Sequence, residues 1–257
     1  MRIQIKAKKL INKSFSVLGY KIISKSTFNY KFDLTDQETE ILNYVLENRL
    51  TMGSKDNLAA TILAARYVCK NKIKGDFVEC GVWRGGHGIA AALTFNLYNI
   101  QKKVICLDTF LGMTKPTDND FSNYNKLKAI SEFNFNSRGD HNSWCFASYE
   151  EVQANFLCAG VSKDNFQLIK GDVAETLPKF KVNAISILRL DTDWYESTKT
   201  ELKYLWPRLS VDGVLVVDDY GHWQGSKKAV DEFFESTSSI LFHAIDYTSR
   251  SGIKTKY

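Results

Sequence analysis

Two pairs of acidic residues each follow a short apolar run in the second half of the chain. Asp191 and Asp193 come after one run, and Asp218 and Asp219 come after the next. Neighbouring parallel strands end at the same edge of a sheet, so we expect these carboxyl groups to converge there. Converging carboxylates repel one another unless protons or a hard cation compensate them. Because no His and Cys set accompanies them, the pattern favours Mg²⁺ or Mn²⁺ over zinc.

A glycine-rich segment follows an earlier apolar run. Residues 79–88 contain four glycines, which would let a turn close tightly and let a ligand approach the backbone. The segment is not a phosphate loop, and the second glycine of a dinucleotide fingerprint would fall at Trp83. The next apolar run ends in Asp108, which is placed to accept hydrogen bonds from two ribose hydroxyls. The pattern predicts a nucleoside cofactor without phosphates.

Each of these features also has a purely structural interpretation. The glycines alone are compatible with a plain strand-to-helix turn, and Asp108 is equally a residue type that caps a following helix. Asp172, after a third apolar run, could accept from an exocyclic adenine amine or cap the next helix. The spacing between the glycine segment and Asp108 favours the ribose interpretation for Asp108.

The elements that would position these residues alternate along the chain. Short apolar runs predict strands, and runs with helical spacing lie between them, which is typical of βαβ units and a parallel sheet. Predicted strands are 77–80, 104–107, 166–169, 185–188 and 214–217, and predicted helices are 36–48, 57–69, 88–97, 150–156, 196–205 and 227–234. The fold class is therefore α/β with a doubly wound sheet.

Three further segments complete the predicted organisation. Residues 240–245 and 253–257 are strand-like, and the short connection between them requires an antiparallel hairpin. Residues 114–165 are too long for a simple connection, and we expect them to form a lid over a second substrate. Residues 1–50 form a predicted basic helical extension before a single catalytic domain, 51–257.

Composition limits the classes of partner. The chain has 257 residues, of which 44% are hydrophobic, and a formal net charge of +5, which argues against a nucleic-acid partner. The basic, partly apolar residues 1–50 predict either a helix that packs on the domain or a peripheral contact with an anionic membrane. Five cysteines without close pairing predict buried, reduced thiols in a cytoplasmic protein. A homo-oligomer is one open alternative for the assembly.

With these residues in view, the chain resembles the macrocin O-methyltransferase family. The resemblance runs from Thr51 to Phe234 and is specific in five segments: Gly75–Gly86, Asp108–Met113, Gly171–Pro178, Leu190–Thr198 and Val217–Gly221. Members of that family methylate sugar hydroxyls using S-adenosylmethionine and Mg²⁺. The resemblance implies a class I S-adenosylmethionine methyltransferase sheet, which is Rossmann-like and ends in an antiparallel hairpin. It also implies a glycan or small-molecule acceptor, in bacterial surface-glycan or natural-product synthesis.

The resemblance also implies roles for individual residues. Asp191, Asp218 and Asp219 would bind the metal ion, and a loop before the first strand would close over the cofactor. The residues implied in cofactor binding are Thr51, Met52, Ser54, Glu79, Gly81, Trp83, Gly85, Gly86, Asp108, Thr109, Phe110, Asp172, Val173 and Asp191.

The base that deprotonates the acceptor has two candidates. Asp193 lies farther from its strand than Asp191, towards the acceptor, and we predict that it is the base, with His222 in reserve. The alternatives are that Asp193 caps the following helix and that His222 is a surface imidazole. Two other functions remain to be distinguished: a catechol-type O-methyltransferase and a non-catalytic protein at a membrane surface.

Overall fold

The computed structural model describes residues 33–122, 124, 128–237 and 240–255. The chain divides into two compact units, residues 1–39 and 40–257. Most of the predicted basic extension, residues 1–32, lies outside the described residues. Within the described part, no helix is both long and apolar enough to cross a membrane.

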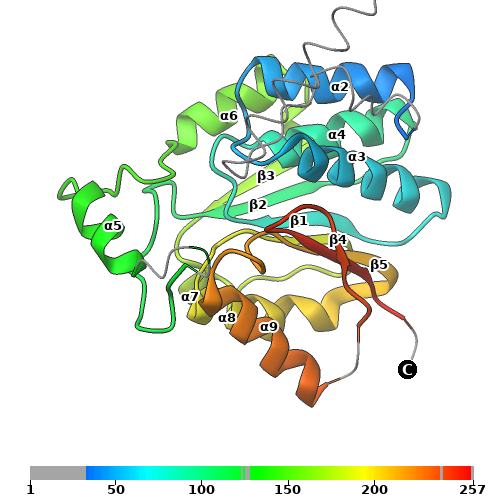
Figure 1. The fold of residues 1–257 in the computed structure, drawn as a ribbon. Helices are drawn as coiled ribbons and strands as arrows, with labels where there is room; N and C mark the ends of the chain where they lie inside the picture. The colour runs from blue at the N-terminus through cyan, green and yellow to red at the C-terminus, as the bar shows by residue number, and fades with distance from the viewer. Residues whose placement is uncertain (1–32, 123, 125–127, 238–239, 256–257) are drawn as a thin grey trace, which may run out of the picture. The chain divides into compact units, whose positions relative to one another are not determined.

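One seven-stranded sheet organises the larger unit (Figure 1). The strand order is β3-β2-β1-β4-β5-β7-β6. The first five strands of this order are parallel to one another, and β7 pairs antiparallel with β5 on one side and with β6 on the other. The strands are β1 (Asp76–Cys80), β2 (Val104–Asp108), β3 (Phe166–Lys170), β4 (Ile185–Leu190), β5 (Leu209–Val217), β6 (His243–Ala244) and β7 (Arg250–Ile253). This order confirms the doubly wound α/β fold.

Helices cover both faces of the sheet (Figure 1). On one face lie α3 (Lys55–Lys70), α4 (Gly86–Leu97) and α6 (Tyr149–Cys158), and on the other α7 (Val173–Thr176), α8 (Tyr195–Leu205) and α9 (Gln224–Ser236). The remaining elements are α2 (Asp36–Glu47), α5 (Ala129–Asn136), and the 3₁₀ turns η3 (Lys163–Asn165) and η4 (Trp206–Arg208). Because both faces are covered, the central strands bury their side chains on both sides, which explains their nearly unbroken apolar sequences.

The C-terminal hairpin forms as predicted, but its second strand begins earlier. Residues 253–257 were expected to be a strand, whereas β7 begins at Arg250 and ends at Ile253. Asp246 is the reason, because its carboxylate accepts from the backbone N–H groups of Thr248 and Ser249. These two bonds close the turn directly after Ile245, so the chain reverses earlier than its pattern indicates.

The prediction that the cysteines are buried holds for three of the five. Cys69, Cys80 and Cys106 are buried, Cys145 is half-buried, and Cys158 is exposed. Cys158 is the last residue of α6, and its exposure corrects the prediction at this position. All five are free thiols.

The segment predicted as a lid is anchored to the domain at its base. The side chain of Asp120 is buried, with Oδ2 accepting from the N–H of Thr117 at 2.6 Å and Oδ1 from the N–H of Tyr195 at 2.9 Å. Tyr195 is the first residue of α8, so Asp120 satisfies a free donor at that helix start. Beside it, the rings of Trp144, Trp194 and Trp223 pack with centroids 5.1 to 6.0 Å apart.

Replacing Asp120 with Ala should lower the free energy of unfolding by about 2 kcal/mol, because it leaves buried N–H groups without an acceptor. Urea denaturation of the two proteins measures this difference. The exposed neighbour Asp118 provides the matched control, and Asp118→Ala should change stability by less than about 0.5 kcal/mol. Equal stability of the two variants would contradict the anchoring role of Asp120.

Candidate active site

A cavity of about 650 Å³ opens at the carboxyl edge of the parallel strands. The loops that follow β1 to β5 contribute to its walls, together with residues 50–54 before α3 and residues 246–248 between β6 and β7. Most residues implied in cofactor binding line it: Thr51, Met52, Ser54, Gly81, Trp83, Gly86, Asp108, Thr109, Asp172, Val173 and Asp191. Asp193, Asp218 and Asp219 line the same cavity, so the two predicted halves of the site are continuous.

Three of the implied cofactor residues and one candidate base do not line the cavity: Glu79, Gly85, Phe110 and His222. Glu79 is buried in β1 and faces Arg189. Gly85 has a φ of 84° and packs against Phe156 as the cap of α4. The backbone N–H of Phe110 donates to Asp108 at 2.7 Å. These three residues therefore support residues of the site without lining the cavity themselves.

Arg189 is the residue that joins the carboxylates of the site. It lies on β4 with only 1% of its surface exposed, and its guanidinium contacts the carboxylates of Glu79 at 3.1 Å, Asp191 at 2.8 Å and Asp218 at 3.0 Å. A fourth bond, from Nη1 to Oδ1 of Asn57 at 2.9 Å, reaches α3. Burying an arginine is costly unless it is paired in this way.

Asp218 is held tightly within this network. Its Oδ1 accepts from Arg189, from the hydroxyl of Ser249 at 2.6 Å and from the amide of Asn57. Burial alone would raise the pKa of Asp218, but the charge of Arg189 and the hydrogen bonds of Asp191 and Ser249 outweigh it and hold the pKa below its ordinary value. Asp218 is therefore ionised and fixed in place.

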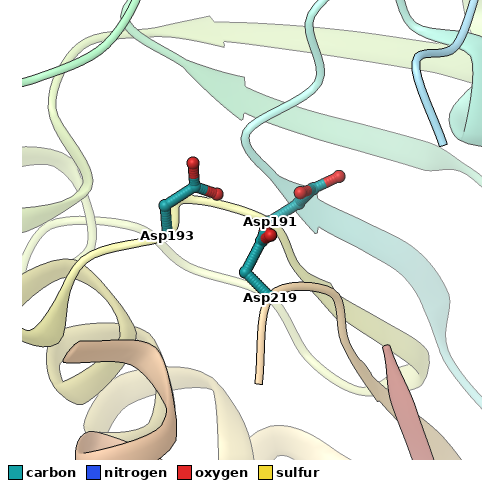
Figure 2. Close-up of side chains that lie close together, drawn as sticks. All are labelled: Asp191, Asp193 and Asp219. Atoms are coloured by element: carbon teal, nitrogen blue, oxygen red, sulfur yellow. The ribbon is translucent and has the colours of Figure 1, made fainter. Parts of the chain in front are cut away.

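Three carboxylates come together in front of this network. Asp191, Asp193 and Asp219 each offer an oxygen within 4.8 Å of the others, which is close enough for all three to hold one metal ion. Figure 2 shows Asp191 and Asp193 on the segment after β4, and Asp219 on the neighbouring segment after β5. The resemblance implied that Asp218 binds the metal ion together with Asp191 and Asp219. In this geometry the third carboxylate near Asp191 and Asp219 is that of Asp193, whereas the carboxylate of Asp218 contacts Arg189.

The charges in this cluster are poorly compensated by the protein. Burial raises the pKa of Asp219 well above its ordinary value, and the charges of Asp193 and Asp218 raise it further. Burial also raises the pKa of Asp193, to about 7, although a hydrogen bond with Asp219 acts in the opposite direction. The same residues would hold a proton or a cation favourably, because either removes this repulsion.

The local backbone explains how the acids reach the cavity. The N–H of Asp191 donates to the carbonyl of Cys80 at 2.9 Å, which brings the segment after β4 close to the glycine loop. Gly81 permits this approach, because a Cβ there would lie 1.9 Å from the carbonyl oxygen of Asp191. Asp193 has a φ of 69°, which turns the chain away from the strand before α8. Thr192, between the acids, donates to the buried Glu201 at 2.8 Å.

A short loop before α3 closes one side of the cavity. The N–H of Gly53 donates to Oγ1 of Thr51 at 3.0 Å, and the same hydroxyl contacts the buried ring of His87. Ser54 caps α3 and also donates to Asp246 at 2.5 Å. The sequence implied this loop through the resemblance, but its connection to the C-terminal hairpin was not predicted.

Several site residues escaped the sequence analysis. Arg189, Asn57 and Ser249 form the buried network, and Tyr247 lines the cavity from the hairpin turn. A charged residue inside the apolar run of β4 was the available signal for Arg189, since an unpaired arginine is almost never buried. Asn57, Ser249 and Tyr247 carry no comparable signal.

Comparison with known proteins gives a consistent family relationship. A family model described as Macrocin-O-methyltransferase (TylF) matches residues 7–249. Demethyldecarbamoylnovobiocin O-methyltransferase of Streptomyces niveus is 31% identical over 65% of this chain and 60% of its own length. Mycinamicin III 3''-O-methyltransferase of Micromonospora griseorubida is 30% identical over 59% of this chain and 57% of its own. The chain thus matches about three fifths of the length of these relatives.

Solved structures confirm the fold predicted from the resemblance. The structure of the O-methyltransferase NovP superposes with a TM-score of 0.71 at 28% identity, covering 80% of this chain and 83% of NovP. The calicheamicin methyltransferase CalS11 superposes with a TM-score of 0.61 at 17% identity, covering 91% and 95%. The fold is the class I S-adenosylmethionine methyltransferase fold, with its C-terminal antiparallel hairpin.

Replacing Arg189 with Met should lower the free energy of unfolding by about 3 to 5 kcal/mol at pH 7, because it leaves buried carboxylates without their partner. The loss should be smaller near pH 4. In the native chain the pKa of Asp218 lies below its unfolded value, so the stabilisation by ionised Asp218 is still present near pH 4 and is lost only as the pH falls through the folded value. In the variant the same buried carboxylates lack Arg189, so they take up protons near pH 4, and the cost of their unpaired charge is removed. Urea denaturation at both pH values measures the difference.

Arg84 provides the matched control for this experiment. It pairs with Glu151 at the surface, with 38% of each side chain exposed. Arg84→Met should change the free energy of unfolding by less than about 1 kcal/mol at either pH. A loss in the Arg189 variant that does not depend on pH would show that the carboxylates are not what Arg189 stabilises.

Proposed function

Because the chain belongs to the macrocin O-methyltransferase family, we propose that it transfers a methyl group from S-adenosylmethionine to a sugar hydroxyl. The observation that carries the proposal is the single cavity in which a glycine loop with a nearby acid meets a cluster of carboxylates. One relative, from Streptomyces olivaceus, is named as a 4'-O-methyltransferase of a tetracenomycin that carries a rhamnosyl group, and another as a mycinamicin III 3''-O-methyltransferase. We place the reaction in bacterial surface-glycan or natural-product synthesis.

The glycine-loop end of the cavity suits the nucleoside part of the cofactor. Each oxygen of Asp108 accepts one close backbone N–H at 2.7 Å, from Val82 and from Phe110. A carboxylate accepts about four hydrogen bonds, and the backbone N–H of Trp83 and the hydroxyl of Thr109, at 3.5 Å, also bond to Asp108, so ribose hydroxyls would replace the weaker of these contacts. Asp172 lines the cavity while capping α7 through the N–H of Ala174 at 2.8 Å, so its structural and binding roles are compatible. The cofactor would supply the electrophilic methyl group.

The carboxylate end suits a hard divalent cation. Oxygen-only donors within 4.8 Å of one another match the preference of Mg²⁺ and Mn²⁺. Asp191 and Asp219 belong both to the set implied by the resemblance and to the set that the geometry brings together, so we assign them to the cation. Asp218 precedes Asp219 in the chain and shares the guanidinium of Arg189 with Asp191. A bound cation would orient the acceptor hydroxyl and lower its pKa.

Asp193 is the proposed base. It lies on the cavity wall beyond Asp191, where the chain has left the strand, and it is not among the carboxylates that contact Arg189. A carboxylate in that position can accept the proton of an acceptor hydroxyl while the methyl group is transferred. His222 is less well placed for this role, because it does not line the cavity.

Activity on neutral glycosides tests the function directly. The full chain with Mg²⁺ should bind S-adenosylmethionine in calorimetry and should add one methyl group to at least one of a panel of 4-nitrophenyl glycosides, detected by mass spectrometry. Excess EDTA should abolish turnover, and added Mg²⁺ or Mn²⁺ should restore it, because the carboxylate cluster needs a cation to bind the acceptor. Methylation of 4-nitrocatechol alone would favour a catechol-type enzyme, and full turnover in EDTA would exclude metal dependence.

Replacing Asp193 with Asn should lower kcat by about 100-fold or more while the affinity for S-adenosylmethionine stays nearly unchanged, because the variant lacks the base. Asp191→Asn is the matched control at the same loop and should weaken metal binding. Metal titration and single-turnover methylation separate the two effects. If Asp193→Asn loses the metal while Asp191→Asn retains it, the two roles are reversed, and Asp193 is the ligand.

A further inference from the structure

The turn of the C-terminal hairpin forms one wall of the cavity. Residues 246–248, between β6 and β7, line the cavity together with the carboxylate cluster. We propose that this turn binds the acceptor sugar, with Tyr247 contacting the sugar and His222 positioning Tyr247. The inference rests on the proposed function and identifies which part of the chain recognises the acceptor.

The turn is held rigidly against the site. The N–H of Gly221 donates to the carbonyl of Thr248 at 2.7 Å, and a Cβ at Gly221 would lie 2.0 Å from the carbonyl oxygen of Tyr247. Ser249 donates to Asp218, and Asp246 accepts from Ser54. The turn is thus fixed at both ends and against its middle, which is a prerequisite for a binding wall of defined shape.

Tyr247 is the exposed aromatic group of this wall. Tyr247 is 60% exposed, although its backbone carbonyl packs closely against Gly221. A tyrosine combines a large apolar ring with a polar hydroxyl, and an exposed ring beside a cavity offers an apolar surface to a ligand. A sugar ring has one face rich in C–H groups and an edge of hydroxyls, and both parts of Tyr247 match that chemistry.

His222 fixes the direction of the Tyr247 hydroxyl. Nδ1 of His222 and the phenol oxygen of Tyr247 share a hydrogen bond, and the ring of His222 packs on Trp223 with centroids 4.7 Å apart. With Nδ1 accepting from the phenol, the lone pairs of the phenol oxygen remain available for a hydroxyl of the acceptor.

Another part of the cavity wall comes from the segment predicted as a lid. Thr114 and Cys145 line the cavity from that segment, and Met113 lines it directly before the segment begins. The indole N–H of Trp194 donates to the carbonyl of Thr114 at 3.0 Å. The charge of Asp219 acts on both Cys145 and Tyr247, so an acceptor that contacts both residues would lie next to the carboxylates. The charge of Asp246, whose pKa is held below its ordinary value by the hydrogen bonds from Ser54, Thr248 and Ser249, acts on Tyr247, which suits a neutral sugar better than a phosphorylated one.

Binding of 4-nitrophenyl α-L-rhamnopyranoside tests this inference. The probe is chosen because one relative is named for methylating a tetracenomycin that carries a rhamnosyl group. Calorimetry is done on the full chain saturated with S-adenosylhomocysteine and Mg²⁺. Tyr247→Phe should weaken binding about tenfold through the lost hydrogen bond, and Tyr247→Ala about fiftyfold through the lost ring as well. His222→Phe should weaken it about fivefold.

Non-additivity distinguishes positioning from independent contacts. Adding His222→Phe to Tyr247→Phe should weaken binding no further, because His222 acts through the Tyr247 hydroxyl. Tyr67→Phe, on α3 and away from the cavity, is the matched control and should bind normally. The affinity for S-adenosylmethionine and the melting temperature should be unchanged in all variants, which excludes a folding defect.

Three outcomes would overturn the inference in different ways. Normal rhamnoside binding by Tyr247→Ala would remove the turn from the acceptor site while leaving the proposed function intact. Fully additive losses in the double variant would remove the positioning role of His222. If the native chain binds the cofactor but neither binds the rhamnoside nor methylates any glycoside, the sugar-acceptor function fails, and this inference fails with it.

Discussion

The buried guanidinium of Arg189 is the interaction on which the site depends. It contacts carboxylates from β1, from the segment after β4 and from the segment after β5, and it bonds to Asn57 of α3. A buried charge of this kind must be surrounded by opposite charge and by hydrogen-bonding groups. The elements that supply those groups are therefore held in one relative arrangement.

The effect of Arg189 extends beyond its direct partners. Asn57 also donates to Ser249, which links α3 to the hairpin, and its backbone N–H donates to Ser54 at the start of α3. The loop before α3 and the hairpin, which form two walls of the cavity, are thus both linked through Asn57 to the guanidinium of Arg189. This connection explains how several acids can converge at one sheet edge, since Arg189 compensates Glu79, Asp218 and Asp191 while Asp193 and Asp219 stay available to a cation or a proton.

The features that could be predicted from sequence are those that depend on local pattern. Apolar runs separated by helical spacing identified the five parallel strands, and an acid within two residues of a strand end is placed at the sheet edge by the strand itself, as Asp191 and Asp219 show. Features that depend on individual side-chain contacts, near or distant in the sequence, were not predictable. The position of β7 follows from the side chain of Asp246, and the place of Asp218 behind the cluster follows from Arg189. Neither partner is visible in a periodic pattern.

The contact between Ser54 and Asp246 has a consequence for how the protein is made. These residues lie 192 positions apart, and Asn57 and Ser249 repeat the same separation. During synthesis the loop before α3 leaves the ribosome long before the hairpin exists. Ser54 in that loop therefore lacks its contact with Asp246 until much more of the chain has been translated. Contacts of such high sequence separation form late in folding. A ribosome-bound chain with its five parallel strands already assembled would still lack a closed binding site until the hairpin emerges.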